Sequence, residues 1–135
     1  MSSTATRAPA RSCRRDERGV LTDYFTVRER ARRVRILPTL STLIYGYEGI
    51  APGPTIKVRR HRPAVLRVIN ELPEVHPSLG QNSKTSVHLH GSASLQQFDG
   101  YASDVTLPGF YKDYYYPNSQ AARSLWYHDH GVHFT

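Results

Sequence analysis

The amino-acid sequence predicts an all-β protein, an antiparallel β-sandwich or Greek-key barrel built from one domain. Runs of β-branched and aromatic residues recur at short intervals, separated by turn residues such as the APGP of residues 51–54. No segment of useful length shows the 3.6-residue apolar period of an amphipathic helix. The length of 135 residues suits one domain and is too short for two substantial cores.

A basic leader precedes the first predicted strands. Residues 1–19 are mainly Ser, Thr, Ala and Arg with almost nothing to bury, so we expect them to be disordered and the folded part to span residues 20–135. Apolar and polar residues then alternate over residues 21–30 and 33–37, which predicts two half-buried strands with an interruption between them. A further β-branched and aromatic run over residues 42–47 predicts the next strand.

Turn chemistry defines the middle of the chain. The prolines and glycine of residues 51–54 direct the chain into the run 55–59, and residues 60–63 turn it back into the run 64–70. These two runs therefore predict a hairpin.

The second half of the chain alternates between loops and short strands. Residues 71–84 hold two prolines and a glycine and predict a surface loop, and residues 92–112 show little periodicity. Strand-forming residues return at residues 113–116 and 124–128.

The net charge of +7 is uneven, since residues 1–35 hold ten arginines against four acidic residues. The basicity belongs to the leader and first strand, so we expect neither nucleic acid nor a membrane as partner. Cys13 is the single cysteine, which excludes an internal disulfide and a Cys-rich zinc site. The start of the chain lacks the apolar core of a secretory signal, so the sequence assigns no localisation.

Two His-x-His pairs carry the chemistry of the sequence. His88 and His90 lie in one strand-forming run, and His128 and His130 lie in another. Alternate side chains of a strand share a face at a rise of about 3.3 Å per residue, so each pair directs two imidazoles the same way with backbones about 7 Å apart. Neutral imidazole is a ligand for copper, zinc, iron and nickel, and the pairs predict a metal site built from two strands. The alternative is two unrelated strands that happen to carry histidine.

Five motifs in family order resemble the first domain of multicopper oxidases, a cupredoxin (plastocyanin-like) domain, and most closely the branch of bilirubin oxidase, spore-coat laccase and phenoxazinone synthase. The motifs are residues 51–56 (APGPTI), 86–91 (SVHLHG), 98–100 (FDG), 112–118 (KDYYYPN) and 125–130 (LWYHDH). The resemblance implies a cupredoxin-like Greek-key β-sandwich with copper as cofactor. It also implies an oxidase that takes electrons from phenols or tetrapyrroles and reduces O2 to water. Relatives of this kind are often secreted or associated with the spore coat.

The resemblance also implies roles for individual residues. His88 matches a ligand of the type 2 copper, and His90, His128 and His130 match ligands of the type 3 copper pair. Asp99 matches an acidic residue thought to relay protons near that cluster. Without the resemblance, an Asp before a Gly is more simply a turn residue.

The departures from the family pattern define the expected function. The type 1 copper of the family needs a Cys with two His, and the trinuclear cluster takes eight His, whereas this chain offers Cys13 in its leader and four matching histidines. We therefore expect a single, incomplete domain, truncated at the carboxyl end, that contributes half of the type 2/type 3 site. Other cupredoxin domains would complete the site, and we expect no oxidase activity from the chain alone.

Two other hypotheses remain at this point. The first is a stand-alone metal-binding or structural module without oxidase activity. The second is a mononuclear His-metal enzyme, but the chain has no Glu soon after residues 88–90 and does not meet the His-x-His-x-Asp-His order.

Overall fold

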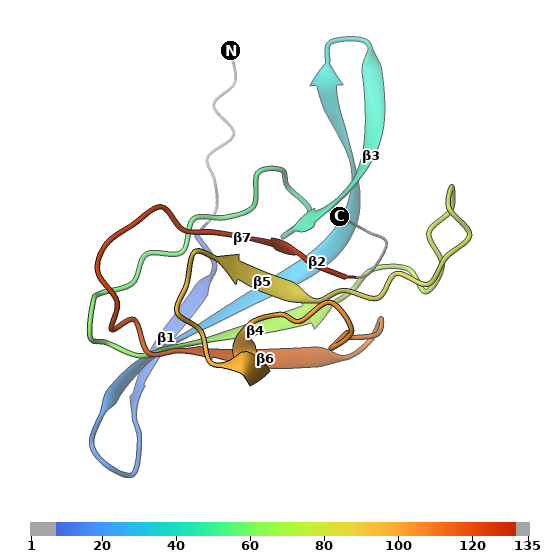
Figure 1. Ribbon diagram of the computed structural model, residues 1–135. Helices are drawn as coiled ribbons and strands as arrows, with labels where there is room; N and C mark the ends of the chain where they lie inside the picture. Colours follow the sequence, from blue (N-terminus) through green and yellow to red (C-terminus); the bar gives the residue numbers. More distant parts are fainter. Residues whose placement is uncertain (1–7, 132–135) are drawn as a thin grey trace.

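The computed structural model describes residues 8–131, and these form two β-sheets that share one core (Figure 1). The larger sheet has five strands in the order β1-β2-β4-β6 with β3 added beside β2, and the smaller sheet pairs β5 with β7. The predicted all-β class is confirmed. The elements are β1 (Ala10–Arg15), β2 (Leu21–Leu37), β3 (Leu40–Tyr47), β4 (Ala64–Asn70), β5 (Val87–His90), the 3-10 turn η1 (Gln96–Phe98), β6 (Tyr111–Tyr116) and β7 (Trp126–Asp129).

The core follows from strand alternation. Every second residue of β4 is buried, and the same period in β2 and β6 places their apolar side chains on the same face of the sheet. The smaller sheet covers this face with Val87, Leu89 and Tyr127. The buried cluster consists of Phe25, Val27, Ala64, Leu66, Val68, Val87, Tyr114 and Tyr116.

Strand β2 is the central element of the larger sheet, and its length differs from the prediction. Two strands were expected over residues 21–37, but β2 runs through all 17 residues without interruption. Its first half pairs with β1 and β4, and its second half pairs with β3 alone among the described residues. The second half is continuous because backbone bonds to β3 replace the missing core contacts.

The leader prediction is wrong for residues 10–15, which form β1; residues 1–7 lie outside the described range. All six side chains of β1 are exposed, so the sequence was right that they bury nothing. The strand is held by backbone pairing with β2 and by Arg11, whose Nη2 donates to both carboxylate oxygens of buried Asp23 at 3.0 Å. Arg62 binds the same carboxylate at 2.6 Å. Pairing of this kind leaves no apolar pattern in the sequence.

The predicted hairpin of residues 55–59 with residues 64–70 is also wrong. Residues 55–59 form no strand and have no ladder partner among the described residues, and β4 instead pairs parallel with β2 and antiparallel with β6. The sandwich is therefore mixed and not purely antiparallel. His61, at the turn, adopts a φ of 61°, and its N–H donates to the carbonyl of Asn118 at 2.8 Å.

No helix among the described residues is long and apolar enough to cross a membrane.

Candidate metal centre

The smaller sheet brings the two His-x-His pairs together. In the antiparallel ladder of β5 and β7, His88 lies directly opposite His128, and His90 lies opposite Trp126. Residues opposite each other on one face have Cβ atoms about 5 Å apart, so this register alone forces the two pairs into contact. His130 follows β7 directly, and its N–H donates to the Ser86 carbonyl at 2.7 Å.

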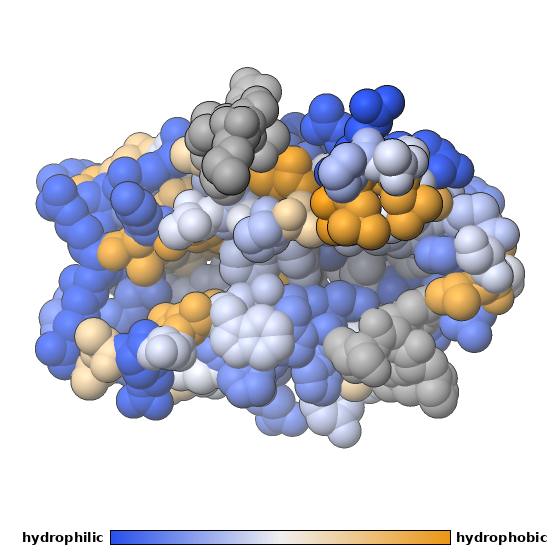
Figure 2. All heavy atoms as spheres, turned by 90° about the horizontal axis from the view of Figure 1, so that it is seen from above, coloured by the Kyte–Doolittle hydropathy of each residue, from blue (hydrophilic) through white to orange (hydrophobic). Residues whose placement is uncertain are grey.

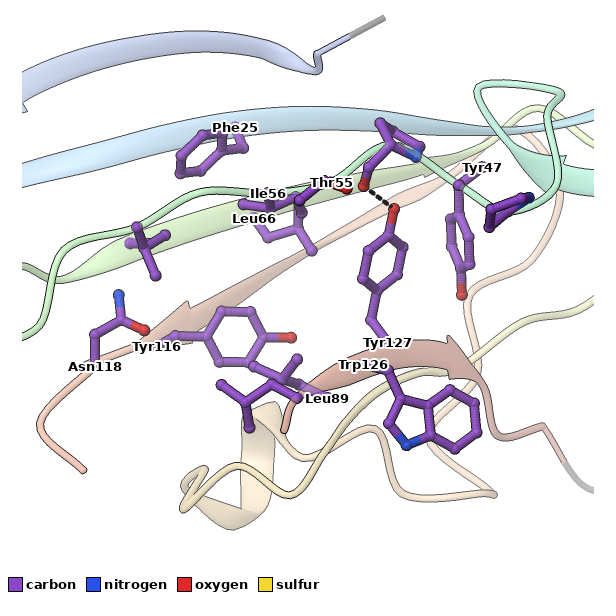
Figure 3. A pocket seen from close by; sticks show the side chains of 16 residues that line it. Phe25, Tyr47, Thr55, Ile56, Leu66, Leu89, Tyr116, Asn118, Trp126 and Tyr127 are labelled. Carbon is purple, nitrogen blue, oxygen red and sulfur yellow. Dashed lines mark hydrogen bonds between the residues drawn. The ribbon is translucent and has the colours of Figure 1, made fainter. Parts of the chain in front are cut away.

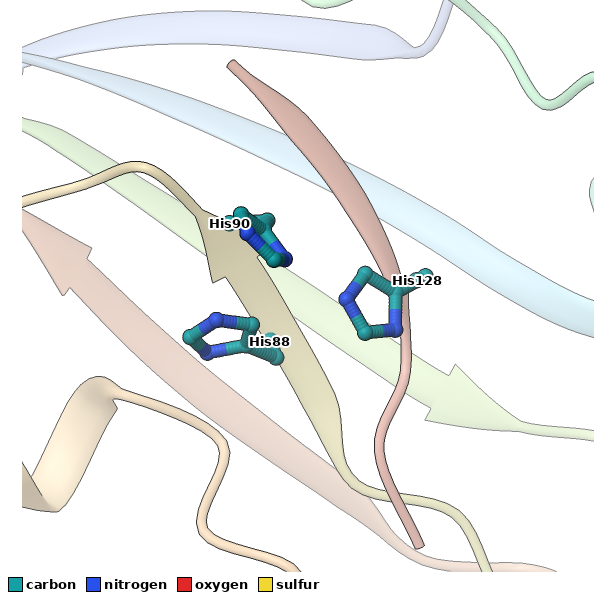
Figure 4. A group of neighbouring side chains, drawn as sticks. All are labelled: His88, His90 and His128. Atoms are coloured by element: carbon teal, nitrogen blue, oxygen red, sulfur yellow. The ribbon is translucent and has the colours of Figure 1, made fainter. Parts of the chain in front are cut away.

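The four imidazoles form one cluster. Ring centroids lie 5.4 Å apart for His88 and His90, 5.4 Å for His88 and His128, and 5.2 Å for His88 and His130. Each of His88, His90 and His128 offers one ligand atom within 4.8 Å of the others (Figure 4). His130 belongs to the ring cluster but not to that tighter group of three. The sequence prediction that the four histidines converge is met by these distances.

Two of the imidazoles have one nitrogen occupied and the other directed at the cluster. The Nδ1 of His88 hydrogen-bonds to the Asp99 carbonyl, and the Nδ1 of His128 lies 2.6 Å from the Asp129 carbonyl. A carbonyl accepts, so each Nδ1 carries the proton and each Nε2 keeps a free lone pair. The Nε2 of His128 is buried and has no hydrogen-bond partner within residues 8–131. A buried acceptor without a partner, next to two more imidazoles, fits a first-row transition metal such as copper.

The turn of residues 98–100 positions Asp99 against the cluster. Gly100 has a φ of 71°, and a Cβ there would lie 2.1 Å from the carbonyl oxygen of Val87. Only glycine permits this approach, which places the Asp99 carbonyl on His88. The Asp99 carboxylate is half exposed, with Oδ1 3.6 Å from His88 Nδ1.

Two tyrosine hydroxyls anchor the short strands, and sequence reasoning missed both. The backbone N–H of Val87 donates to the Tyr114 hydroxyl at 3.0 Å, which ties β5 to β6. The Tyr127 hydroxyl donates to the Pro54 carbonyl at 2.6 Å, which ties β7 to the Pro-Gly-Pro turn (Figure 3). Gly53 lies so close to Tyr127 that a Cβ would sit 2.8 Å from its hydroxyl oxygen. Aromatic residues at strand spacing predict packing, and nothing in the sequence marks which hydroxyl finds a partner.

Asp129 is the second residue that sequence reasoning missed. Its Oδ1 accepts from the backbone N–H groups of Ser86 at 2.8 Å and Gly131 at 3.1 Å. These bonds hold the start of β5 against the end of β7. His128 and His130 flank Asp129 at this point of the chain. The position of Asp129 between His128 and His130 was the signal in the sequence that could have identified it.

A buried carboxyl lies at the seam between the sheets. Glu29 is 4% exposed, and burial, with a contribution from the Asp129 charge, raises its pKa from the ordinary 4.5 to about 7. The Thr85 hydroxyl donates to its Oε2 at 2.7 Å, which acts in the opposite direction. Glu29 and Asp129 both line a cavity of about 500 Å³ that also reaches His128.

Cys13 and the remaining described histidines lie in other surroundings. Cys13 is exposed on β1, where Arg62 donates to its sulfur at 2.8 Å. His61 occupies the turn before β4, and His76 Nδ1 accepts from two backbone N–H groups in the loop of residues 71–84. None of them belongs to the cluster of three histidines.

Comparison with known proteins agrees with this arrangement. The multicopper oxidase family model matches residues 30–133. The chain belongs to the multicopper oxidase family. Bilirubin oxidase of Albifimbria verrucaria is 45% identical over 113 residues, which cover 83% of this chain and 18% of that protein. Laccase of Bacillus subtilis (strain 168) is 36% identical over 115 residues, covering 70% of this chain and 22% of the relative.

The fold agrees as well. The multi-copper oxidase from Pseudomonas thermotolerans superimposes with a TM-score of 0.71 at 25% identity, over 84% of this chain and 26% of that one. The predicted cupredoxin-like sandwich is confirmed by this likeness, and homologues in the multicopper oxidase family bind copper. The chain spans about a fifth of the length of the two curated relatives named above.

Proposed function

We propose that His88, His90, His128 and His130 are copper ligands that supply one side of a polynuclear centre shared with another cupredoxin domain. In this arrangement His88 serves the type 2 copper, and the other three serve the type 3 pair. The whole protein would then be an oxidase that reduces O2 with electrons from a phenolic or tetrapyrrole donor. The names of the relatives, bilirubin oxidase and laccase, support that class of donor.

The observation that carries the proposal is the register of β5 and β7. It brings the His88 ring within 5.4 Å of the other three rings, measured between ring centroids. His88, His90 and His128 each offer a ligand atom within 4.8 Å of the others, and His130 stands outside that group, which supports a centre of more than one ion. His90 and His130 are exposed, which leaves their rings accessible to a further set of ligands from outside the described residues.

Copper supplies the one-electron chemistry, and the residues of this chain supply ligands, orientation and a proton path. The Asp99 carbonyl holds the proton of His88 on Nδ1, and the Asp129 carbonyl does the same for His128, so both rings present Nε2. Asp129 keeps the ends of the two strands together through its bonds to Ser86 and Gly131.

We assign the proton relay to the Asp99 carboxylate because its half-exposed position joins solvent to the edge of the cluster. The test uses this segment joined to the domains that complete the centre. Asp99→Asn should lower O2 uptake without changing copper content, and Asp99→Glu should restore most of it. Loss of copper in Asp99→Asn would show instead that the residue only positions His88.

Copper binding by the 135-residue chain tests the ligand assignment directly. Substitution of a residue that only hydrogen-bonds to a metal ligand lowers metal affinity by roughly 10- to 100-fold. We expect His128→Asn to weaken Cu²⁺ binding by more than this. The matched control is His61→Asn, which removes an exposed imidazole and keeps a residue that tolerates a positive φ. Bound metal is measured by native mass spectrometry, and nitrogen hyperfine coupling by electron paramagnetic resonance. Equal copper binding by both variants would overturn the assignment.

A second candidate function is a stand-alone metal module without oxidase activity. It is supported by the tight group of three, His88, His90 and His128, which alone offers three ligands to a single ion. Copper stoichiometry and His130→Asn separate the two proposals. One ion per chain that is insensitive to His130→Asn favours the module, and more than one ion with sensitivity favours the shared centre. We also propose that this chain alone does not oxidise phenols, and sustained O2 uptake with a phenolic donor would contradict that.

A further inference from the structure

The second half of β2 and the first part of β3 form an arm that leaves the body of the sandwich. Residues 32–37 pair only with β3 within the described range, because β1 and β4 pair with β2 no further than Glu29. At about 3.3 Å per residue this stretch extends about 20 Å. Figure 1 shows the hairpin of β2 and β3 projecting beyond the two sheets. The name "arm" is used below for residues 32–43.

The tip of the arm is apolar and exposed. Ile36 is 66% exposed, Leu37 57% and Leu40 54%, and Leu37 pairs with Leu40 across the turn. Figure 2 shows apolar residues on this side of the molecule with hydrophilic residues beside them. A single exposed leucine is ordinary, but here the paired Leu37 and Leu40, with Ile36 next to them in the chain, make the tip of the arm apolar.

The sides of the arm are basic. Arg32, Arg33 and Arg35 are exposed, and no ion pair engages them within residues 8–131. Arg28 and Arg30, nearer the body, pair instead with Glu48 and Glu71. The arm itself contains no Asp or Glu, so its charge is uncompensated.

We propose that the arm docks on an anionic lipid surface, with its apolar tip entering the interfacial region and its arginines on the headgroup phosphates. An aliphatic tip bordered by cations matches the two layers of such a surface, hydrocarbon below and anionic phosphate above. Long arginine side chains reach back to the phosphate level while the tip enters.

Other partners fit the arm less well. Sites for single-stranded nucleic acid stack bases on aromatic side chains, and the exposed tip is purely aliphatic. A stable protein interface buries about 800 Å² on each partner, more than three aliphatic side chains at a turn provide. The sequence suggested no membrane partner because it assigned the basicity to the leader and the first strand. The structure places three of these arginines together on the exposed arm.

The experiment is co-sedimentation of the 135-residue chain with vesicles of phosphatidylcholine alone or mixed equally with phosphatidylglycerol. We expect binding to the mixed vesicles that weakens as salt rises, and little binding to pure phosphatidylcholine. Arg32→Gln, Arg33→Gln and Arg35→Gln combined should lower partitioning roughly 100-fold, since each arginine contributes about fivefold. Ile36→Ser, Leu37→Ser and Leu40→Ser combined should lower it at least about tenfold.

Matched triple variants serve as controls. Arg18→Gln, Arg59→Gln and Arg60→Gln remove the same charge from exposed positions elsewhere, and Val75→Ser, Leu79→Ser and Leu95→Ser remove exposed apolar groups elsewhere. We expect each control to change partitioning by less than about threefold, and circular dichroism to show all four variants folded. The proposal is overturned if arm and control variants lose binding equally, or if the chain binds both vesicle types equally. It is also overturned if the chain prefers duplex DNA to vesicles, or if the arm forms dimers that do not bind vesicles. Copper binding is independent of this result.

Discussion

The two sheets of the sandwich are held in different ways. The larger sheet has ladders of six or more paired residues and most of the buried apolar side chains. The smaller sheet has one ladder of four residue pairs, carries the histidines, and depends on the hydroxyls of Tyr114 and Tyr127 for its attachment. Strands this short are marginal alone. The difference teaches that stability and the candidate metal site are separable, so a substitution can remove one and spare the other.

The largest expected effect comes from the core that both sheets share. Leu66 is 4% exposed in β4, and Leu66→Ala should lower the free energy of unfolding by about 3 to 4 kcal/mol through lost contacts and a residual cavity. Urea denaturation followed by circular dichroism measures this. Leu95→Ala, at a side chain 51% exposed, is the control and should stay within about 0.5 kcal/mol. Equal effects at the two sites would show that burial of Leu66 does not stabilise the shared core.

The next effect is a pH dependence at the seam between the sheets. Burial raises the pKa of Glu29 from 4.5 to about 7, so the folded chain holds a proton that the unfolded chain releases. The stabilising contribution is full below about pH 4.5 and is lost as pH rises to about 7, a change of about 3 kcal/mol. Unfolding by urea at several pH values measures it. Glu29→Gln should flatten the profile over this window, and an unchanged slope would assign the effect to other groups.

A substitution in β6 should loosen the attachment of the smaller sheet to the larger one. Tyr114→Phe removes the acceptor of the buried Val87 N–H and should cost about 1 to 3 kcal/mol. It should also weaken copper binding, because β5 loses its anchor. The matched control is Tyr116→Phe in the same strand, since that hydroxyl is buried without a partner in the described residues, and its removal should be neutral or stabilising. Identical results for the two tyrosines would show that the anchor does not matter.

The smallest effect belongs to the outer face of the larger sheet. Arg67 makes two 2.7 Å bonds to Asp113 across β4 and β6 and lies 4.1 Å from the Tyr111 ring centroid. Both charged groups are exposed, so Arg67→Gln should lower the free energy of unfolding by no more than about 1 kcal/mol. This loss should be smaller still in high salt. Thermal unfolding at two salt concentrations tests it. A loss of stability comparable to that of Leu66→Ala would mean that the Arg67–Asp113 pair stabilises the fold far more than an exposed ion pair does.

Strand alternation in the sequence predicted the strands whose alternate side chains are buried. The pattern over residues 64–70 became β4, and residues 113–116 fall within β6, because their alternate side chains face the core. The convergence of His88 with His128 was also predictable, since paired strands leave them on one face.

The remaining features depend on contacts between segments that no local pattern records. Strand β1 is held by backbone pairing and by Arg11 on Asp23, with no apolar residue to announce it. The parallel partner of β4 lies about 40 residues earlier in β2, a choice that turn residues do not encode. The anchors at Tyr114 and Tyr127 depend on which backbone group each hydroxyl meets.

The pairing of His88 with His128 also sets an order of events during folding. These residues are 40 positions apart, so their ladder closes a long loop for only four pairs of residues. The hairpins of β1 with β2 and of β2 with β3 close much shorter loops and form sooner. The ladders of β4 with β2 and with β6 close loops that are also about 40 residues or longer but form six or seven residue pairs, so we expect the smaller sheet to add later to a surface that already presents the Tyr114 hydroxyl. An ion that needs both histidine strands therefore arrives after the chain has largely folded, and it acts by slowing unfolding more than by speeding folding.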